Sequence, residues 1–119
     1  MNKVFLVAGG SGGHLFPALS LFEQLKDYDT LILTDKRTEK YLKRLGMKYR
    51  KIITARLKIN FFLVFNLLKL FLSILENIAI IIKRKPDIII GFGGYTSIPT
   101  IIAAKILNKK IIIHEQNAV

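Results

Sequence analysis

The sequence predicts an α/β fold, a doubly wound, Rossmann-like parallel sheet with helices on its faces. Three observations predict it. Short apolar runs alternate along the chain with stretches of helical periodicity. The runs lack polar alternation, which is typical of strands buried on both faces of a parallel sheet. Two runs end in glycine-rich segments, at 9–13 and 91–94, and ligands of such sheets bind at the carboxyl ends of the strands.

The elements follow in order from these patterns. Glycine ends the first strand, Pro17 lies in the first turn of the first helix, where proline is tolerated, and Gly46 stops the second helix. The predicted strands are 3–8, 30–34, 49–53, 87–90 and 110–114, and the predicted helices are 16–25, 38–45, 60–82 and 99–107. Right-handed connections give the strand order 3-2-1-4-5, with the two glycine-rich loops facing each other across one crevice.

The segment 60–82 is long and apolar enough to suggest a membrane span. Its polar residues, however, recur at three- and four-residue steps and so share one stripe of a helix: Asn66, Lys69, Ser73, Glu76 and Asn77. A span would bury Lys69 and Glu76 in hydrocarbon, at roughly 2.5–3.5 kcal/mol each. We therefore expect a core helix that crosses from the third strand to the fourth.

Basic and aromatic side chains gather where this segment begins. Arg56 and Lys58 stand beside Phe61, Phe62 and Phe65, a combination typical of segments that dip into a membrane interface. We expect these five residues to contact a membrane, with ordinary core packing as the alternative.

The charge of the chain calls for an anionic partner. The formal net charge is +11, and ten of the nineteen basic residues lie between Lys36 and Lys58. No nucleic-acid-binding motif accompanies this charge, so nucleic acid is not expected as a partner and an anionic membrane surface is. A general lysine-rich and isoleucine-rich coding bias is the alternative explanation.

Composition bounds the chemistry. The chain has 119 residues, enough for one domain, and no cysteine, which excludes disulfides, thiolate metal sites and a cysteine nucleophile. Its two histidines, His14 and His114, have no neighbouring metal-ligand spacing, so no metal site is expected.

The first glycine-rich loop has the features of an anion site. Its residues Gly10, Ser11, Gly12 and Gly13 leave a strand and enter a helix, where free N–H groups and the helix dipole favour a phosphate. A P-loop is excluded because His14 and Leu15 follow instead of lysine and a hydroxyl residue. The dinucleotide fingerprint fails at Leu15, although Asp35 lies where a ribose-binding acid is expected. A small dinucleotide-binding protein therefore stays open.

The second loop repeats the arrangement, with Gly93, Gly94, Tyr95, Thr96 and Ser97 between a strand and a helix. Two such loops in one crevice suit a pyrophosphate better than a single phosphate. Either loop alone could be only a tight turn.

Two histidine-containing segments complete the crevice. His14 lies in a first helical turn, where the dipole favours the neutral imidazole, so it is a candidate general base. A capping or packing role is the alternative. The four polar residues 114–117 follow the fifth strand and suggest a ligand-facing loop, although such residues can also only cap a strand.

Three motifs together resemble a known family. Gly9 to His14 with Pro17, Gly93-Gly94-Tyr95 with Ser97 and Pro99, and His114-Glu115-Gln116-Asn117 look like the N-terminal domain of the MurG family. These bacterial transferases move N-acetylglucosamine from UDP-N-acetylglucosamine to undecaprenyl-pyrophosphoryl-N-acetylmuramoyl-pentapeptide in peptidoglycan synthesis. The resemblance covers essentially the whole chain.

The resemblance implies a fold, a partner set and roles for residues. It implies the N-terminal half of a GT-B glycosyltransferase, with 1–119 an incomplete acceptor-binding domain and the UDP-sugar-binding domain absent, so that the chain alone is expected to be inactive. The glycine loops would cradle the acceptor pyrophosphate. His14 would deprotonate the muramoyl 4-hydroxyl in an inverting transfer, and Ser11, Tyr95, Glu115 and Asn117 would contact the acceptor and the transferred sugar. The segment from Asn60 would associate with the cytoplasmic face of the inner membrane, as a peripheral contact. No metal or cofactor is implied.

The chain also departs from the family pattern. Ser11 stands where threonine is usual, and Thr96 and Ile98 replace residues that are often smaller or more apolar, so the second loop is expected to pack differently. Two other functions remain open: a non-catalytic, membrane-anchoring acceptor subunit of a split glycosyltransferase, and the small dinucleotide-binding protein.

Overall fold

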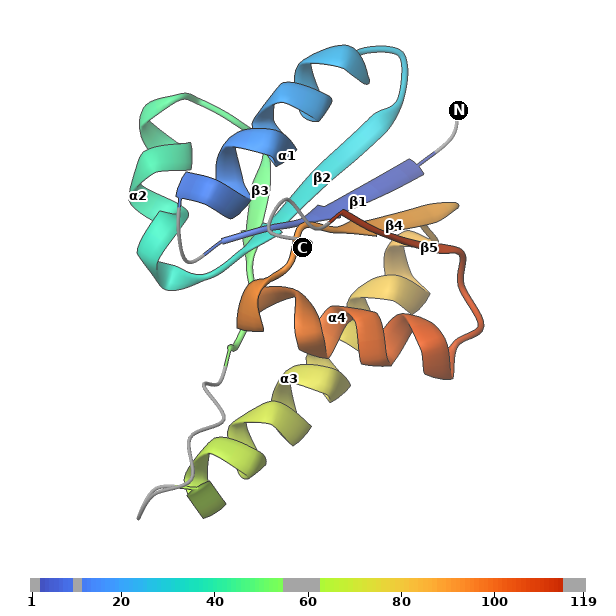
Figure 1. The fold of residues 1–119 in the computed structure, drawn as a ribbon. Coiled ribbons are helices and arrows are strands. Elements are labelled where there is room, and N and C mark those ends of the chain that lie inside the picture. The colour runs from blue at the N-terminus through green and yellow to red at the C-terminus, as the bar shows by residue number, and fades with distance from the viewer. Residues whose placement is uncertain (1–2, 10–11, 55–62, 115–119) are drawn as a thin grey trace.

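A parallel sheet of five strands, in the order β3-β2-β1-β4-β5, forms the centre of the computed structural model (Figure 1). The structure describes residues 3–9, 12–54 and 63–114. The strands are β1 Lys3–Val7, β2 Asp29–Thr34, β3 Tyr49–Lys51, β4 Ile88–Gly91 and β5 Ile111–Ile113. The helices are α1 Gly12–Gln24, α2 Lys36–Arg44, α3 Leu63–Arg84 and α4 Gly94–Ile106. The predicted fold class and strand order are both confirmed.

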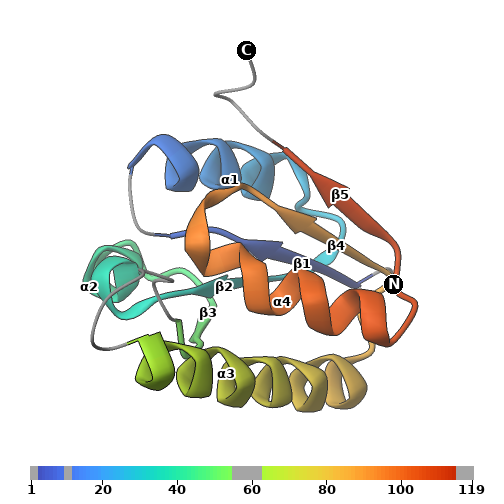
Figure 2. The ribbon, with the colours of Figure 1, turned by 60° about the horizontal axis from the view of Figure 1, so that its bottom comes forward.

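Helices cover both faces of the sheet, with α1 on one face and α3 and α4 on the other (Figure 2). Alternate residues of β1 point to opposite faces: Val4 and Leu6 pack on the side of α1 and α2, whereas Phe5 and Val7 pack on the side of α3 and α4. Burial on both faces explains why the strands lack polar alternation. The chain runs from β1 towards one edge and from β4 towards the other, so the switch point of the fold lies between β1 and β4.

Two helices begin earlier than the sequence predicts. α1 begins at Gly12 instead of residue 16, and α4 at Gly94 instead of residue 99. The prediction placed Pro17 and Pro99 in a first turn, where proline is favoured, but each is the sixth residue of its helix. The second glycine-rich loop is therefore short, and Gly94 to Ser97 form the first turn of α4. Each proline therefore lies inside its helix, although proline is favoured at the first position of a helix.

Helix α3 is the expected crossover, but it buries two polar residues and leaves many large apolar ones exposed. Ser73 and Asn77 are fully buried against the rest of the protein, together with Ile81. The exposed large apolar side chains lie on the other side of α3: Val64, Phe65, Leu67, Leu68, Phe71, Leu72, Leu75 and Ile82. By length and composition α3 is able to cross a membrane, and only 22% of its most apolar window is buried. The expectation of a core helix is correct for the position of α3 and wrong for its outward face.

Hydrogen bonds hold the polar side of α3 inward. The Asn77 amide oxygen accepts from the Thr100 hydroxyl of α4 at 2.6 Å, and its nitrogen donates to the Ser73 carbonyl at 2.8 Å. The Glu76 carboxylate accepts from the Ile53 N–H at 2.8 Å, and the Ser73 hydroxyl donates to the Ile53 carbonyl. A buried polar group without a partner costs about 1–3 kcal/mol. These bonds therefore oppose any rotation of α3 that would bury its apolar side instead.

Candidate functional site

The carboxyl ends of β1, β4 and β5 meet at one edge of the sheet. Val7 pairs with Gly91 in register. The Phe92 N–H donates to the Val7 carbonyl at 3.0 Å, and the His114 N–H donates to the Gly91 carbonyl at 2.8 Å. The ladder thus brings the residues that follow three strands to one place, as the sequence predicts for the two glycine-rich segments and for His114.

Two helices begin at this edge, on opposite faces of the sheet (Figure 2). Gly12, Gly13 and His14 are the first residues of α1, and Gly94 is the first residue of α4. The first four N–H groups of a helix have no partner within the helix, and its N-terminus carries a partial positive charge. The edge therefore offers two sets of N–H donors to an anion, one from each helix.

Glycine is required where α4 begins. Gly93 has φ of 85° and ψ of −175°, and Gly94 has φ of 74°, a conformation that other residues rarely adopt. A Cβ atom on Gly91 would lie 2.9 Å from the Ile101 side chain, so glycine also lets α4 approach β4 closely. Gly93 has no side chain that could cap α4. No side chain of this N-cap residue therefore competes with a ligand for the N–H groups at the start of the helix.

The hydroxyls of the second loop point inward. Thr96 and Ser97 are 0% and 2% exposed. The Ser97 hydroxyl donates to the carbonyls of Gly93 and Gly94, both at 3.1 Å, and the Thr96 hydroxyl donates to Asp35 at 2.9 Å. A ligand at this edge would therefore not meet the side-chain hydroxyls of these two residues.

Asp35 lies beneath the edge and is 2% exposed. It caps α2: one carboxylate oxygen accepts from the N–H groups of Arg37 and Thr38 at 3.0 and 3.2 Å. The other oxygen accepts from Thr96, and the Arg37 guanidinium lies 3.5 Å from it. A Cβ atom on Gly9 would come within 3.0 Å of this carboxylate.

The proposal that Asp35 binds a ribose is therefore wrong. An acid that recognises ribose hydroxyls must present free oxygen lone pairs to the ligand. The oxygens of Asp35 are occupied by protein donors and lie under Gly9. The structure removes the main support for a dinucleotide-binding function.

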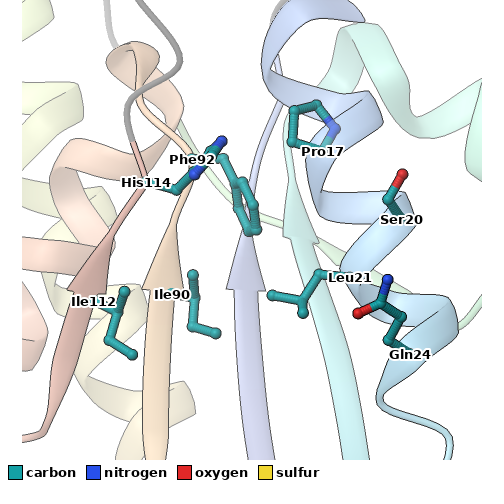
Figure 3. Close-up of a pocket in the computed structure, with 8 residues that line it drawn as sticks. All are labelled: Pro17, Ser20, Leu21, Gln24, Ile90, Phe92, Ile112 and His114. Carbon is teal, nitrogen blue, oxygen red and sulfur yellow. The ribbon is translucent and has the colours of Figure 1, made fainter. Parts of the chain in front are cut away.

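A pocket of about 500 Å³ opens beside the edge, on the face that carries α1 (Figure 3). It is lined by Pro17, Ser20, Leu21 and Gln24 of α1 and by Ile90, Phe92, Ile112 and His114 of the β4–β5 side. The His114 ring lies 5.4 Å from the Phe92 ring. No pattern in the sequence predicts this apolar pocket beside α1. Its lining is mostly apolar and includes no glycine of either loop, so it suits an apolar group and not a phosphate.

Several predicted site residues lie outside the described residues. These are Gly10 and Ser11 of the first loop, Glu115 and Asn117 after β5, and the membrane-facing residues Arg56, Lys58, Phe61 and Phe62. Phe65 is described, lies on the outward side of α3 and is 63% exposed. Within 3–9, 12–54 and 63–114, no three acidic or histidine side chains gather as metal ligands.

Basic side chains border the apolar face of α3. Lys36 at the start of α2 and Lys51 of β3 line a hollow of about 340 Å³ together with Glu76 of α3. Lys69 and Lys83 of α3 are exposed beside its apolar side chains. An apolar stripe with cations at its borders is typical of helices that lie in a membrane interface.

Comparison with known proteins gives one family. The model of the glycosyltransferase family 28 N-terminal domain matches residues 4–119. The chain is 40% identical over 120 residues to the UDP-N-acetylglucosamine--N-acetylmuramyl-(pentapeptide) pyrophosphoryl-undecaprenol N-acetylglucosamine transferase of Rickettsia rickettsii, covering 99% of this chain and 31% of that protein. It is 42% identical to the protein of the same name from a Wolbachia of Brugia malayi, covering 98% of this chain and 33% of that protein. The chain thus spans about a third of the length of these curated relatives.

Solved structures agree with this fold. The crystal structure of Acinetobacter baumannii MurG superposes with a TM-score of 0.80 at 29% identity, covering 99% of this chain and 36% of that chain. The glycosyltransferase VinC superposes with a TM-score of 0.66 at 12% identity, covering 95% of this chain and 34% of that chain, which shows the fold alone. The resemblance to the MurG family in the three motifs is confirmed, and so is the match to the N-terminal half of a GT-B enzyme.

Proposed function

The chain belongs to the glycosyltransferase family 28 N-terminal domains, and we propose that it is the acceptor-binding and membrane-binding half of an inverting N-acetylglucosaminyltransferase. The acceptor is undecaprenyl-pyrophosphoryl-N-acetylmuramoyl-pentapeptide, and the donor is UDP-N-acetylglucosamine. One observation supports this most: α1 and α4 both begin at the carboxyl-end edge of the sheet, on opposite faces and next to the switch point. Two sets of N–H donors at one edge suit a group with two linked phosphates.

The backbone of the two loops binds the acceptor pyrophosphate in this proposal. The residues involved are Gly10, Ser11, Gly12, Gly13, Gly93, Gly94, Tyr95, Thr96 and Ser97. A phosphate at a helix N-terminus gains both hydrogen bonds and dipole stabilisation, and two helix ends can share the charge. Because Thr96 and Ser97 are buried and turn their hydroxyls inward, they contribute to this site through the local geometry of the α4 N-terminus.

His14 is the general base in this proposal. It lies in the first turn of α1, beside the N–H groups that hold the pyrophosphate. Its imidazole removes the proton from the 4-hydroxyl of the muramoyl sugar. The oxygen then attacks the anomeric carbon of N-acetylglucosamine, the bond to UDP breaks, and the configuration inverts. Glu115 and Asn117 contact the two sugars, and a C-terminal domain, on the same or a second polypeptide, holds the UDP-sugar.

The outward face of α3 binds the membrane in this proposal. Phe65, Leu68 and Phe71 lie on that face, with Arg56, Lys58, Phe61 and Phe62 preceding it in the sequence. The contact is peripheral, at the cytoplasmic face of the inner membrane. A spanning α3 would lose the bonds of Asn77 to Thr100 and of Glu76 to Ile53, whereas a helix lying in the interface keeps them.

A transfer assay tests the proposal. With a UDP-sugar-binding half present, on the same or a second polypeptide, we expect N-acetylglucosamine to be transferred to the lipid-linked acceptor with inversion. An acceptor analogue with one phosphate should have a KM at least about tenfold higher, because one helix N-terminus loses its anion. Equal KM values for the two acceptors would contradict the pyrophosphate cradle, and absence of transfer would contradict the proposed reaction.

A further inference from the structure

One hydrogen bond joins two distant parts of the chain directly beneath the glycine loops. The Thr96 hydroxyl of α4 donates to the Asp35 carboxylate at 2.9 Å, although the two residues are 61 positions apart in sequence. Thr96 is 0% exposed and Asp35 is 2% exposed. Bonds from a neutral donor to a buried charge are among the stronger ones in proteins.

The carboxylate is itself held rigidly. Asp35 receives the N–H groups of Arg37 and Thr38 at the start of α2 and the hydroxyl of Thr38 at 3.3 Å. Its negative charge is thereby offset by the N-terminus of α2 and by the Arg37 guanidinium at 3.5 Å. The Asp35 carboxylate therefore has a fixed position, and the first turn of α4 is hydrogen-bonded to it through Thr96.

Residues of both glycine segments contact the Asp35 carboxylate or lie directly against it. Gly9, which ends the described part of the first loop, leaves a Cβ space that the Asp35 carboxylate and the Thr34 hydroxyl fill, at 3.0 and 3.2 Å. Thr96 is the third residue of α4, so it belongs to the first turn, whose N–H groups have no partner in the helix. Contacts with Asp35 thus help to fix the start of α4 relative to Gly9, which precedes α1.

We propose that Thr96 is a positioning residue for the acceptor pyrophosphate. Its bond to Asp35 fixes the N-terminus of α4 relative to the first glycine loop. The inference rests on the proposed function and deepens it. Thr96 acts through the backbone of α4 and does not touch the substrate with its side chain.

The chain offers a matched control one helical turn away. The Thr100 hydroxyl also donates to a buried acceptor, the Asn77 amide oxygen at 2.6 Å, and Thr100 is also 0% exposed. That bond joins α4 to α3 and not to the edge that carries the loops. Thr100→Val removes a bond of the same kind from the same helix, so it reports what loss of stability alone does.

The test compares KM values in the active enzyme, with the UDP-sugar-binding half present. We expect Thr96→Val to raise the KM for the lipid-linked acceptor about tenfold, which corresponds to roughly 1.4 kcal/mol, and to leave the KM for UDP-N-acetylglucosamine unchanged. Thr96→Ser, which keeps the hydroxyl, should restore the acceptor KM. Thr100→Val should lower Tm about as much as Thr96→Val does. It should leave both KM values near those of the wild type.

The opposite results overturn the proposal. Equal acceptor KM values for the wild type and Thr96→Val, or an equal rise for Thr96→Val and Thr100→Val, would show a purely structural role. If Thr96→Val does not fold, Thr96→Ala is measured in the same way with the same two outcomes. Wild-type enzyme that transfers nothing to the lipid acceptor overturns the proposed function itself, whereas normal transfer with an unchanged variant KM overturns only the positioning role.

Discussion

Replacing His14 with alanine should lower the turnover of the complete enzyme by about 10²–10⁴-fold, the range typical of the loss of a general base. The affinity for the lipid acceptor should change little, because a base acts in the transition state and the glycine loops bind the pyrophosphate. The position of His14 in the first turn of α1 supports this expectation. The measurement is kcat together with the acceptor Kd, both with the UDP-sugar-binding half present.

The pH dependence of turnover gives the control. The wild-type rate should fall at acid pH, because a protonated imidazole cannot accept the proton of the muramoyl 4-hydroxyl. This acid limb should be absent from the residual activity of His14→Ala. A variant that keeps normal turnover, or one that loses acceptor binding and turnover together, would contradict the role of His14 as the base.

Replacing Phe71 and Leu75 of α3 with serine should weaken binding to anionic liposomes roughly 10–100-fold. Both side chains are about half exposed, at 57% and 47%, and burying a large apolar side chain completely contributes about 1.5–3 kcal/mol. Partial insertion of two such groups gives the stated range. The measurement is the partition coefficient in liposome co-sedimentation, with Tm recorded for each variant.

A matched pair of substitutions distinguishes membrane contact through α3 from a general effect of removing exposed apolar side chains. Leu45→Ser with Ile106→Ser removes two apolar groups of similar exposure, 50% and 62%, from α2–β3 and α4 positions outside α3. This control should bind liposomes as the wild type does. Equal losses for the two double variants, or unchanged binding by Phe71→Ser with Leu75→Ser, would contradict membrane contact through α3.

The sequence predicts the sheet well because the signal there is local. Unbroken apolar runs between glycine and helical stretches define the strands, and the handedness rule for βαβ units then leaves few strand orders. The same logic places Gly9, Gly93 and His114 at one edge. Their separation in the chain is large, but each simply follows a strand of known direction.

The orientation of α3 was harder to predict because its two faces compete. Its apolar side chains indicate a core helix and its polar stripe indicates a solvent face. The structure buries Ser73 and Asn77 together with apolar residues such as Ile81. Asn77 and Ser73 find partners in Thr100 and Ile53, and many other apolar side chains of α3 stay exposed. Such partners come from other elements, so periodicity along one helix cannot reveal them. An interfacial helix with a satisfied polar inner face is one solution to this conflict.

The role of Asp35 was missed for the same reason. Its position after β2 matches a ribose-binding acid in a dinucleotide fold, and nothing local contradicts that assignment. The capping of α2 and the approach of Thr96 from α4 together show that the carboxylate is occupied. The one sequence signal was the hydroxyl of Thr96 itself. Two such polar residues after β2 and β4, the strands on either side of β1, are candidates for a buried pair.

The most direct test of the acceptor-half assignment is a binding measurement on this chain. The chain is titrated with a lipid-linked muramoyl-pyrophosphate analogue in anionic liposomes, beside UDP-N-acetylglucosamine and NADH. The account predicts binding of the acceptor analogue and little binding of either nucleotide, since the described donors suit a pyrophosphate and Asp35 is closed to a ribose. Binding of NADH, or no acceptor binding by a chain shown to be folded by circular dichroism, would contradict it.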